Sequence, residues 1–174
     1  RATDARLDLA PNADTLRLAP SALVAIDPLG TIEATVPLAS AGTLAVAGEL
    51  FTQSPVRATG GGIALQDSGR IARGTVGNIA SDPDTVLTLQ SGELRGVGTL
   101  TGDLINDGGL VRPGTDTTAG QIDVDGTFTQ KTDGTVNMEL GGSTAGIDYD
   151  LLNARAVDLA GTLRLNFIDN YTLG

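Results

Sequence analysis

Four aspartates in the middle of the chain have a spacing that could support acid–base chemistry. Asp123 and Asp125 share one face of an expected strand, and Asp103 and Asp107 stand near a neighbouring strand. Two carboxyl groups held about 5–9 Å apart can hydrolyse a glycosidic bond. However, Asp107 and Asp125 each precede a glycine, and Asp-Gly pairs are typical of turns. We therefore interpret these aspartates as turn residues and predict no catalytic residue in the chain.

The tripeptide Asp148-Tyr149-Asp150 offers two carboxylates that could bind calcium. Calcium-binding β-rolls carry a glycine-rich nonapeptide repeat, which this sequence lacks. The aspartates are better suited to capping turns, because a short carboxylate accepts hydrogen bonds from nearby backbone N–H groups. We predict no metal site and no cofactor in this chain.

The stretch GVGTLTGDLINDGGLVRPG, Gly96 to Gly114, superficially resembles a phosphate-binding loop. A P-loop ends in Gly-Lys-Ser/Thr, and a dinucleotide site needs a following helix; the sequence offers neither. We interpret the glycines as corners between strands, with Leu100, Leu104 and Leu110 facing the core. The basic residue of the stretch is Arg112, which could contact a carbohydrate or act as a base. In so acidic a chain we expect it to offset nearby aspartates.

The composition excludes several classes of site and partner. The 174 residues include no cysteine and no histidine, which excludes disulfides, Cys/His zinc sites, thiolate nucleophiles and Ser-His-Asp triads. The net charge of −10 disfavours nucleic acid and anionic membranes as partners, because both are negatively charged. No apolar run is long enough to cross a bilayer as a helix. The sequence begins with Arg1 rather than Met, so we expect a processed or excised piece of a longer protein.

Short runs of alternating apolar and polar residues must position these side chains. This period of two is typical of strands with one buried face, and glycine-rich corners separate the runs. No segment predicts a helix of ordinary length. The inward-facing residues expected from the alternation are Leu87, Leu89, Ile122, Val124, Phe128, Val136, Met138, Leu140, Val157, Leu159, Leu163, Leu165 and Phe167.

A short unit, Gly-Thr-apolar, recurs along the chain. It begins at Gly30, Gly42, Gly74, Gly98, Gly126, Gly134 and Gly161. Loosely repeated strand–turn units favour an all-β solenoid, in which glycine makes the corner and threonine enters the strand facing outward. Coils of about 20 residues predict about eight coils and a rod about 40 Å long at the usual strand spacing. The alternative is an antiparallel β-sandwich, which also has short alternating strands.

The C-terminal half resembles a known family. SGELRGVGTLTGDLINDGGLVRPG, then GTFTQ, then MELGGSTAGIDYDLLNARAVDLAGTLRLNF are similar to the autotransporter-associated β-strand repeats of bacterial autotransporter passengers. The likeness runs from about Leu87 to Gly174. It implies a right-handed parallel β-helix, one segment of a longer passenger, with less regular coils over 1–86 and family-like coils over 87–174. The chain departs from the family at Arg112-Pro113-Gly114, where Ser-Pro-Gly is usual.

The resemblance also implies a function and a location. The passenger is expected at the surface of a Gram-negative bacterium or secreted from it, having crossed the outer membrane through a C-terminal barrel of the same precursor. We expect a structural or adhesive role without enzymatic activity, in which a stiff stalk binds a receptor or glycan on another cell, or self-associates. The alternative is an extracellular enzyme acting on a polysaccharide from a β-helix scaffold.

Overall fold

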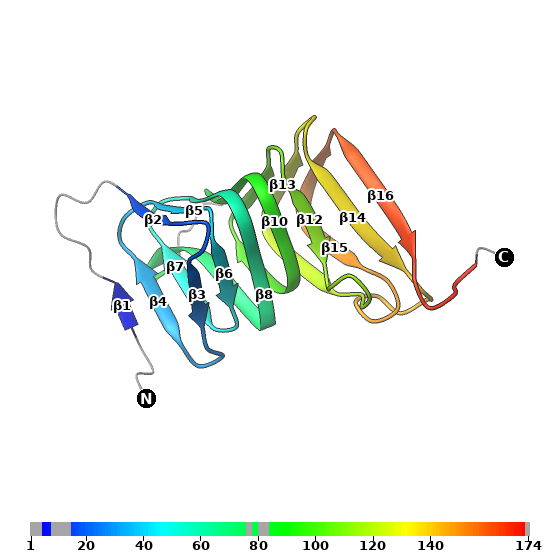
Figure 1. The fold of residues 1–174 in the computed structure, drawn as a ribbon, viewed down its shortest axis with the longest axis horizontal. Helices are drawn as coiled ribbons and strands as arrows, with labels where there is room; N and C mark the ends of the chain where they lie inside the picture. Colours follow the sequence, from blue (N-terminus) through cyan, green and yellow to red (C-terminus); the bar gives the residue numbers. More distant parts are fainter. Residues whose placement is uncertain (1–4, 8–14, 76–77, 80–83, 173–174) are drawn as a thin grey trace.

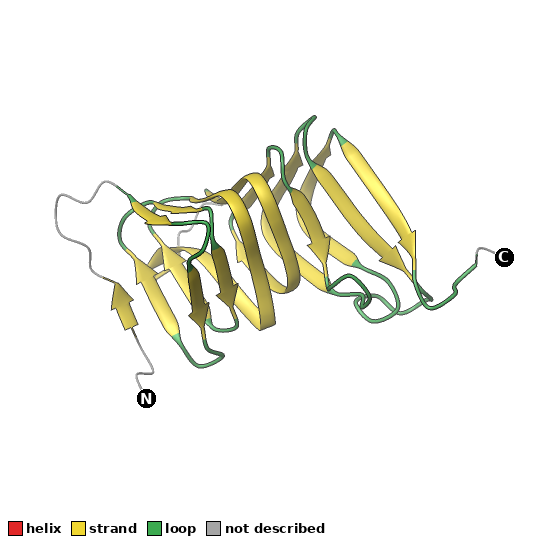
Figure 2. Ribbon diagram, viewed as in Figure 1, coloured by secondary structure: helices red, strands yellow, loops and turns green. Residues whose placement is uncertain are grey.

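The computed structural model describes residues 5–7, 15–75, 78–79 and 84–172. Across these residues there is no helix, and strands join one curled sheet that is almost entirely parallel (Figure 1; Figure 2). The all-β prediction is confirmed. In the part of the chain that is described, no helix is long and apolar enough to cross a membrane.

The strands stack in three columns, and the chain visits the columns in turn. The first column contains β1 (Ala5–Leu7), β4 (Thr31–Ala34), β7 (Glu49–Thr52) and parts of β8 (Val56–Thr75), β10 (Thr85–Thr101), β13 (Gln121–Gln130) and β15 (Leu151–Leu159). The second contains β2 (Leu16–Leu18), β5 (Leu38–Ser40), β11 (Asp103–Asn106) and other parts of β8, β10, β13 and β15. The third contains β3 (Leu23–Ile26), β6 (Thr43–Val46), β12 (Leu110–Pro113), β14 (Thr135–Leu140), β16 (Thr162–Phe167) and the middle of β8 and β10.

Among the described residues each column therefore has seven levels, which we call rungs, where about eight coils were expected. Every pairing within the columns is parallel, as in a β-helix or solenoid, whereas the alternative sandwich requires antiparallel pairs. The short β9 (Asn78–Ile79) pairs antiparallel with β8. Figure 1 shows the blue strands at one end of the stack and β15 and β16 at the other. The glycine-rich part of β8 lies within 1–86, where we expected less regular coils, and it belongs to one strand that passes through all three columns.

Aliphatic side chains stack inside the columns and form one continuous core. In the first column Ile71, Leu100 and Val124 are register partners on successive rungs, and each is at most 3% exposed. In the third column the same holds for Ile63, Leu94 and Val111. Parallel register brings like side chains into contact from rung to rung, so that burial of apolar area stabilises the whole stack.

Two expectations about the core need correction. Leu110 is only half-buried, and its neighbour Val111 faces the core instead. The chain turns at Gly108 and Gly109 immediately before β12, which sets the alternation one residue away from the predicted phase. The inward-facing side chains of the last rung are 51–57% exposed, because no further strand covers them among the described residues; they are Val157, Leu159, Leu163, Leu165 and Phe167.

The glycine corners predicted for the stretch Gly96–Gly114 are confirmed. Gly96, Gly102 and Gly114 have positive φ angles of 107°, 130° and 72°, a backbone conformation that favours glycine. The Gly-Thr-apolar unit lies at or inside strands in six of its seven occurrences. The seventh, which begins at Gly74, extends to Val76, outside the described residues.

A polar pair is buried at the corner between the second and third columns. Asn106 and Gln130 are register partners, and both side chains are almost completely buried. Asn106 accepts a hydrogen bond from the N–H of Gly109 (2.9 Å) and donates to the carbonyl of Thr135 (3.1 Å). Gln130 donates to carbonyls of the next rung, including that of Thr162 (3.1 Å). These amides satisfy backbone groups at a corner where the strand ladder is interrupted.

Candidate functional site

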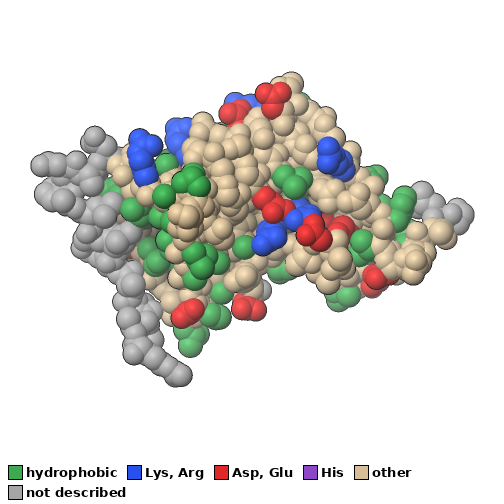
Figure 3. Space-filling model, viewed as in Figure 1, with side chains coloured by type: hydrophobic (Ala, Val, Ile, Leu, Met, Phe, Trp, Pro, Cys, Tyr) green, Lys and Arg blue, Asp and Glu red, His purple; other side chains and the backbone are tan. Residues whose placement is uncertain are grey.

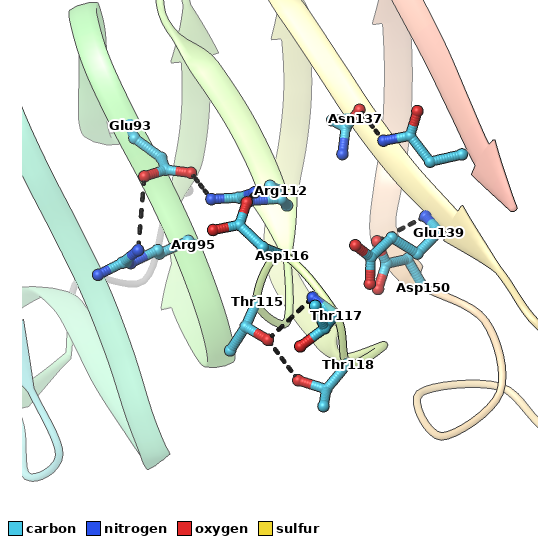
Figure 4. Close-up of polar contacts among 11 residues, drawn as sticks. Glu93, Arg95, Arg112, Thr115, Asp116, Thr117, Thr118, Asn137, Glu139 and Asp150 are labelled. Carbon is cyan, nitrogen blue, oxygen red and sulfur yellow. Dashed lines mark hydrogen bonds and ion pairs between the residues drawn. The ribbon is translucent and has the colours of Figure 1, made fainter. Parts of the chain in front are cut away.

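A cluster of charged side chains lies on the outer side of the third column, and we call it the Arg112 cluster. It comprises Glu93 and Arg95 on β10, Arg112 on β12, Asp116 in the following corner, Glu139 on β14 and Asp150 just before β15. Acidic and basic side chains gather in the middle of the face that Figure 3 shows. Figure 4 shows the residues of the cluster in close-up.

Arg112 is the cationic centre of this cluster. Its side chain is 10% exposed and forms ion pairs with Glu93 and Asp116 (Figure 4). Arg95 lies 3.9 Å from the other oxygen of Glu93, on a more exposed side chain. The expectation that Arg112 offsets nearby acidic residues is thus confirmed, with one aspartate and one glutamate as its partners.

The corner after β12 covers Arg112. The N–H of Gly114 donates to the carbonyl of Gly96 (2.8 Å), and the hydroxyls of Thr115 and Thr118 lie 2.5 Å apart. These contacts fold the segment 114–120 back over the outer face of the column, where alternation alone predicts exposed side chains. Because Asp116 is carried by this segment, it reaches the guanidinium from the solvent side.

Replacing Arg112 with methionine should destabilise the fold by about 1–3 kcal/mol. The change keeps an unbranched side chain but leaves the charges of Glu93 and Asp116 without their partner. The matched control is Arg95→Met, which affects the same Glu93 from a half-exposed position and should cost less than about 1 kcal/mol. Urea unfolding of both variants checks the difference, and equal effects would contradict the central role of Arg112.

Glu139 and Asp150 form the buried acidic part of the cluster. Glu139 is 1% exposed and Asp150 is 2% exposed. The carboxylate of Asp150 accepts hydrogen bonds from the N–H groups of Gly120 and Glu139, both at 2.8 Å. Glu139 Oε2 is buried without a hydrogen-bond partner among the described residues. Burial raises the pKa of both carboxyl groups, and the neighbouring Asp150 raises the pKa of Glu139 further.

Asp148 has a different part in the same corner. Its carboxylate accepts hydrogen bonds from the N–H groups of Thr144 (3.0 Å) and Ser143 (3.2 Å). A hydrogen bond from the side chain of Thr144, followed by the one from its N–H, lowers the pKa of Asp148. The capping role predicted for Asp148 and Asp150 is therefore confirmed, although only Asp148 caps an exposed turn.

The four central aspartates contact different donors, and two of them, Asp123 and Asp125, line the same groove. Asp123 accepts hydrogen bonds from Gln121 and Asn153, and Asp125 lies 2.5 Å from Arg155. The carboxylate of Asp103 accepts a hydrogen bond from the N–H of Thr127 (2.7 Å). At another corner, Asp107 forms an ion pair with Lys131 (3.3 Å). Asp123 and Asp125 line a shallow groove of about 270 Å³ with Asn153 and Arg155. Each of the four carboxylates is engaged by a neighbouring donor, which fits their interpretation as structural residues.

The described residues contain no group of three or more acidic side chains that could hold a metal ion. Asp148 and Asp150 are directed to different backbone donors and do not converge. Comparisons of the chain with family models, curated proteins and solved structures gave no match.

The sequence gives no direct sign that Glu139 is buried. Its position in the alternation of β14 places it on the outer face, where a glutamate is normally solvated. The chain reverses over the segment 141–149 and returns at Asp150, which exchanges hydrogen bonds with Glu139. The clue in the sequence is the pair of glycines, Gly141 and Gly142, because such a pair permits an immediate reversal of the chain.

The contacts of the Arg112 cluster keep one guanidinium group and several carboxyl groups in fixed positions. Arg112 is engaged by two carboxylates, and both oxygens of Asp150 are engaged by backbone donors. These contacts fasten corners to strands. The carboxyl group of Glu139 is the member whose Oε2 has no such contact among the described residues.

Proposed function

We propose that the chain is a right-handed parallel β-helix that serves as a structural and adhesive segment of a secreted or surface-displayed autotransporter passenger. The observation that carries the proposal is the set of three parallel columns with aliphatic cores. In such a stack each coil is hydrogen-bonded to the next along its length, so the structure resists bending. A stiff stalk is the function that this architecture supports best.

The route of secretion rests on the resemblance of residues 87–174 to passenger repeats. The lack of cysteine suits this route, because disulfides formed before translocation would obstruct threading of the chain through the outer membrane. We place the segment outside a Gram-negative cell, with a C-terminal outer-membrane barrel of the same precursor as its partner during secretion.

The last rung supports a place inside a longer stack. Its exposed aliphatic side chains line an open cavity of about 440 Å³ together with Phe128, Met138 and Leu152. The edges of β15 and β16 face the same side. Open strand edges beside exposed apolar residues promote association. In the passenger, a further β-helical rung of the same precursor covers this end.

Adhesion would use the outer faces and corners of the coils. The groove beside Asp123 presents carboxylates, the amide of Asn153 and the guanidinium of Arg155 to solvent. Such groups can hydrogen-bond the hydroxyls of a glycan or the polar surface of a receptor. We propose a receptor or glycan of another cell as the ligand, and self-association of the passengers as a second mode of adhesion.

The proposal is tested by displaying the chain between a secretion signal and an outer-membrane barrel. Cells that display it should bind to glycan-coated or cell-coated surfaces more strongly than cells that display the barrel alone. The purified chain should release no sugar from a panel of extracellular polysaccharides. Sugar release that is lost in the folded variants Asp123→Ala and Asp125→Ala would favour the polysaccharide-acting enzyme instead.

A further inference from the structure

The base of the segment 141–149 is closed by contacts between Glu139 and Asp150. The N–H of Glu139 donates to Asp150 Oδ2 (2.8 Å), and the N–H of Asp150 donates to the carbonyl of Glu139 (2.9 Å). Asp150 Oδ1 accepts the N–H of Gly120, so the same carboxylate also holds the preceding corner. One side chain therefore fastens two corners to the stack, and Figure 4 shows it next to Glu139.

The hydrogen bonds assign different charge states to the two acids. A carboxylate that accepts two backbone N–H groups is favoured in its ionised form, which applies to Asp150. Glu139 Oε2 is buried with no donor among the described residues, which favours the neutral acid. Two ionised carboxylates side by side, both removed from water, would repel one another strongly.

The surrounding charges do not compensate for a second negative charge. Arg112 faces the pair from β12, but Glu93 and Asp116 already share its guanidinium. Asp169, which follows β16, faces Glu139 and adds negative charge. These charges favour a state in which Glu139 and Asp150 together carry one negative charge and keep one proton.

We propose that Glu139 keeps a proton beside the ionised Asp150 and that this proton locks the segment 141–149 onto the stack, making it a pH-sensitive latch. When the proton is lost, repulsion acts at the base of the segment and opens it. The latch lies on the outer face of the third column, so its opening changes the surface that the rod offers to partners. It is independent of the proposed adhesive function, since it rests only on contacts within the chain.

The direction of the pH effect follows from the raised pKa of both groups. The folded pair keeps a proton that the opened pair loses near the ordinary values of 4.5 for Glu139 and 3.8 for Asp150. The latch is therefore fully closed below these values and weakens as the pH rises through the raised pKa of the folded pair. Asp148 has the opposite sign, because its lowered pKa stabilises the turn above 3.8 and that stabilisation is lost on acidification.

Hydrogen–deuterium exchange of the full chain between pH 5 and pH 8 tests the latch. After correction for intrinsic exchange, the amides of Gly120 and Glu139 should lose protection as the pH rises. The opening equilibrium should increase by up to about tenfold per pH unit within the window in which only the folded pair holds the proton. Amides of β6, four rungs before β14 in the third column, should show no such change.

Three variants separate the latch from a general loss of stability. Glu139→Gln keeps the size and backbone contacts of the neutral acid, so protection should stay high across the whole range. Asp150→Asn replaces one acceptor with an amide and should lower protection at every pH. The matched control is Glu49→Gln, a partly exposed glutamate paired with Arg70, which should keep the wild-type profile.

The proposal is overturned if protection of Gly120 and Glu139 in the wild type does not depend on pH in this range. It is equally overturned if Glu139→Gln keeps the wild-type dependence. The carbon-13 shift of the Glu139 carboxyl group gives a second measurement, and titration at its ordinary value of 4.5 would also contradict the proton retained on Glu139.

Discussion

Leu94→Ala should destabilise the chain by about 2–5 kcal/mol, among the largest effects of any single truncation. Leu94 is completely buried in the third column, between its register partners Ile63 and Val111. Removing its side chain leaves a cavity in the middle of the stack, and neighbouring rungs are fixed by their backbone ladders and cannot close around it.

The matched control for Leu94 is Leu163→Ala. Leu163 is a leucine of the same column, but it stands on the last rung and is 56% exposed. Its truncation should reduce the free energy of unfolding by about 1 kcal/mol or less, because the side chain of Leu163 buries little apolar area. Urea unfolding monitored by circular dichroism measures both variants. Equal costs would show that the third column is not packed as a continuous core.

Gly96→Ala should also destabilise the fold strongly, by at least about 2 kcal/mol. Gly96 has a φ of 107°, which side chains rarely adopt, and a Cβ at this position would overlap the backbone carbonyl of Leu65 on the preceding rung. The backbone of that preceding rung cannot yield without breaking the parallel ladder between β8 and β10.

The control for Gly96 is another glycine of the same column. A Cβ on Gly62 would meet no atom closer than 3.9 Å, and this residue has no positive φ. Gly62→Ala should therefore change the free energy of unfolding by less than about 0.5 kcal/mol. Thermal unfolding of the two variants makes the comparison, and a tolerated Gly96→Ala would contradict the close approach of these rungs.

Alternation in the sequence was sufficient to predict most of the inward-facing residues. Leu87, Leu89, Ile122 and Phe128 are buried as expected. Residues two apart point to the same face of a strand, and in these strands that face is packed against the core. The prediction was wrong at Leu110, where two consecutive glycines shift the phase. The number of residues in a glycine corner varies, so the alternation of one strand does not predict which residue of the next strand faces inward.

Exposure of the last rung could not be predicted from the same pattern. Leu163, Leu165 and Phe167 alternate as regularly as the buried residues of β10, yet more than half of each side chain is exposed. Alternation indicates which way a side chain points, whereas burial requires a neighbouring rung on that side. The parallel direction of the pairing was likewise not fixed by alternation, since antiparallel strands have the same period.

The Arg112 cluster was predicted only in part. Arg112-Pro113-Gly114 departs from the repeats that the sequence resembles, which pointed to this corner. The pairing of Arg112 with acidic residues could be expected from the charge of the chain. The burial of Glu139 could not, because it depends on how the chain returns after the segment 141–149 and brings Asp150 against an outward-facing position. Contacts between corners and strands are set by tertiary structure, which a local pattern does not contain.

The three-column arrangement is tested most directly by thiol crosslinking of register partners. The chain has no cysteine, so each introduced pair is unique. One pair per column is suitable: Thr99 with Asp123, Thr88 with Ile105, and Asn137 with Arg164. Register partners on neighbouring strands lie about 4.8 Å apart, within the range that a disulfide or a short thiol crosslinker can span.

All three double-cysteine variants should crosslink within the monomer. Thr99 paired instead with Val124 should crosslink poorly, because Val124 points into the core. Efficient crosslinking in all three columns, with the shifted pair unreactive, is the result expected of stacked parallel rungs. Failure of the three register pairs, or equal reaction of the shifted pair, would contradict the stack and with it the proposed stalk.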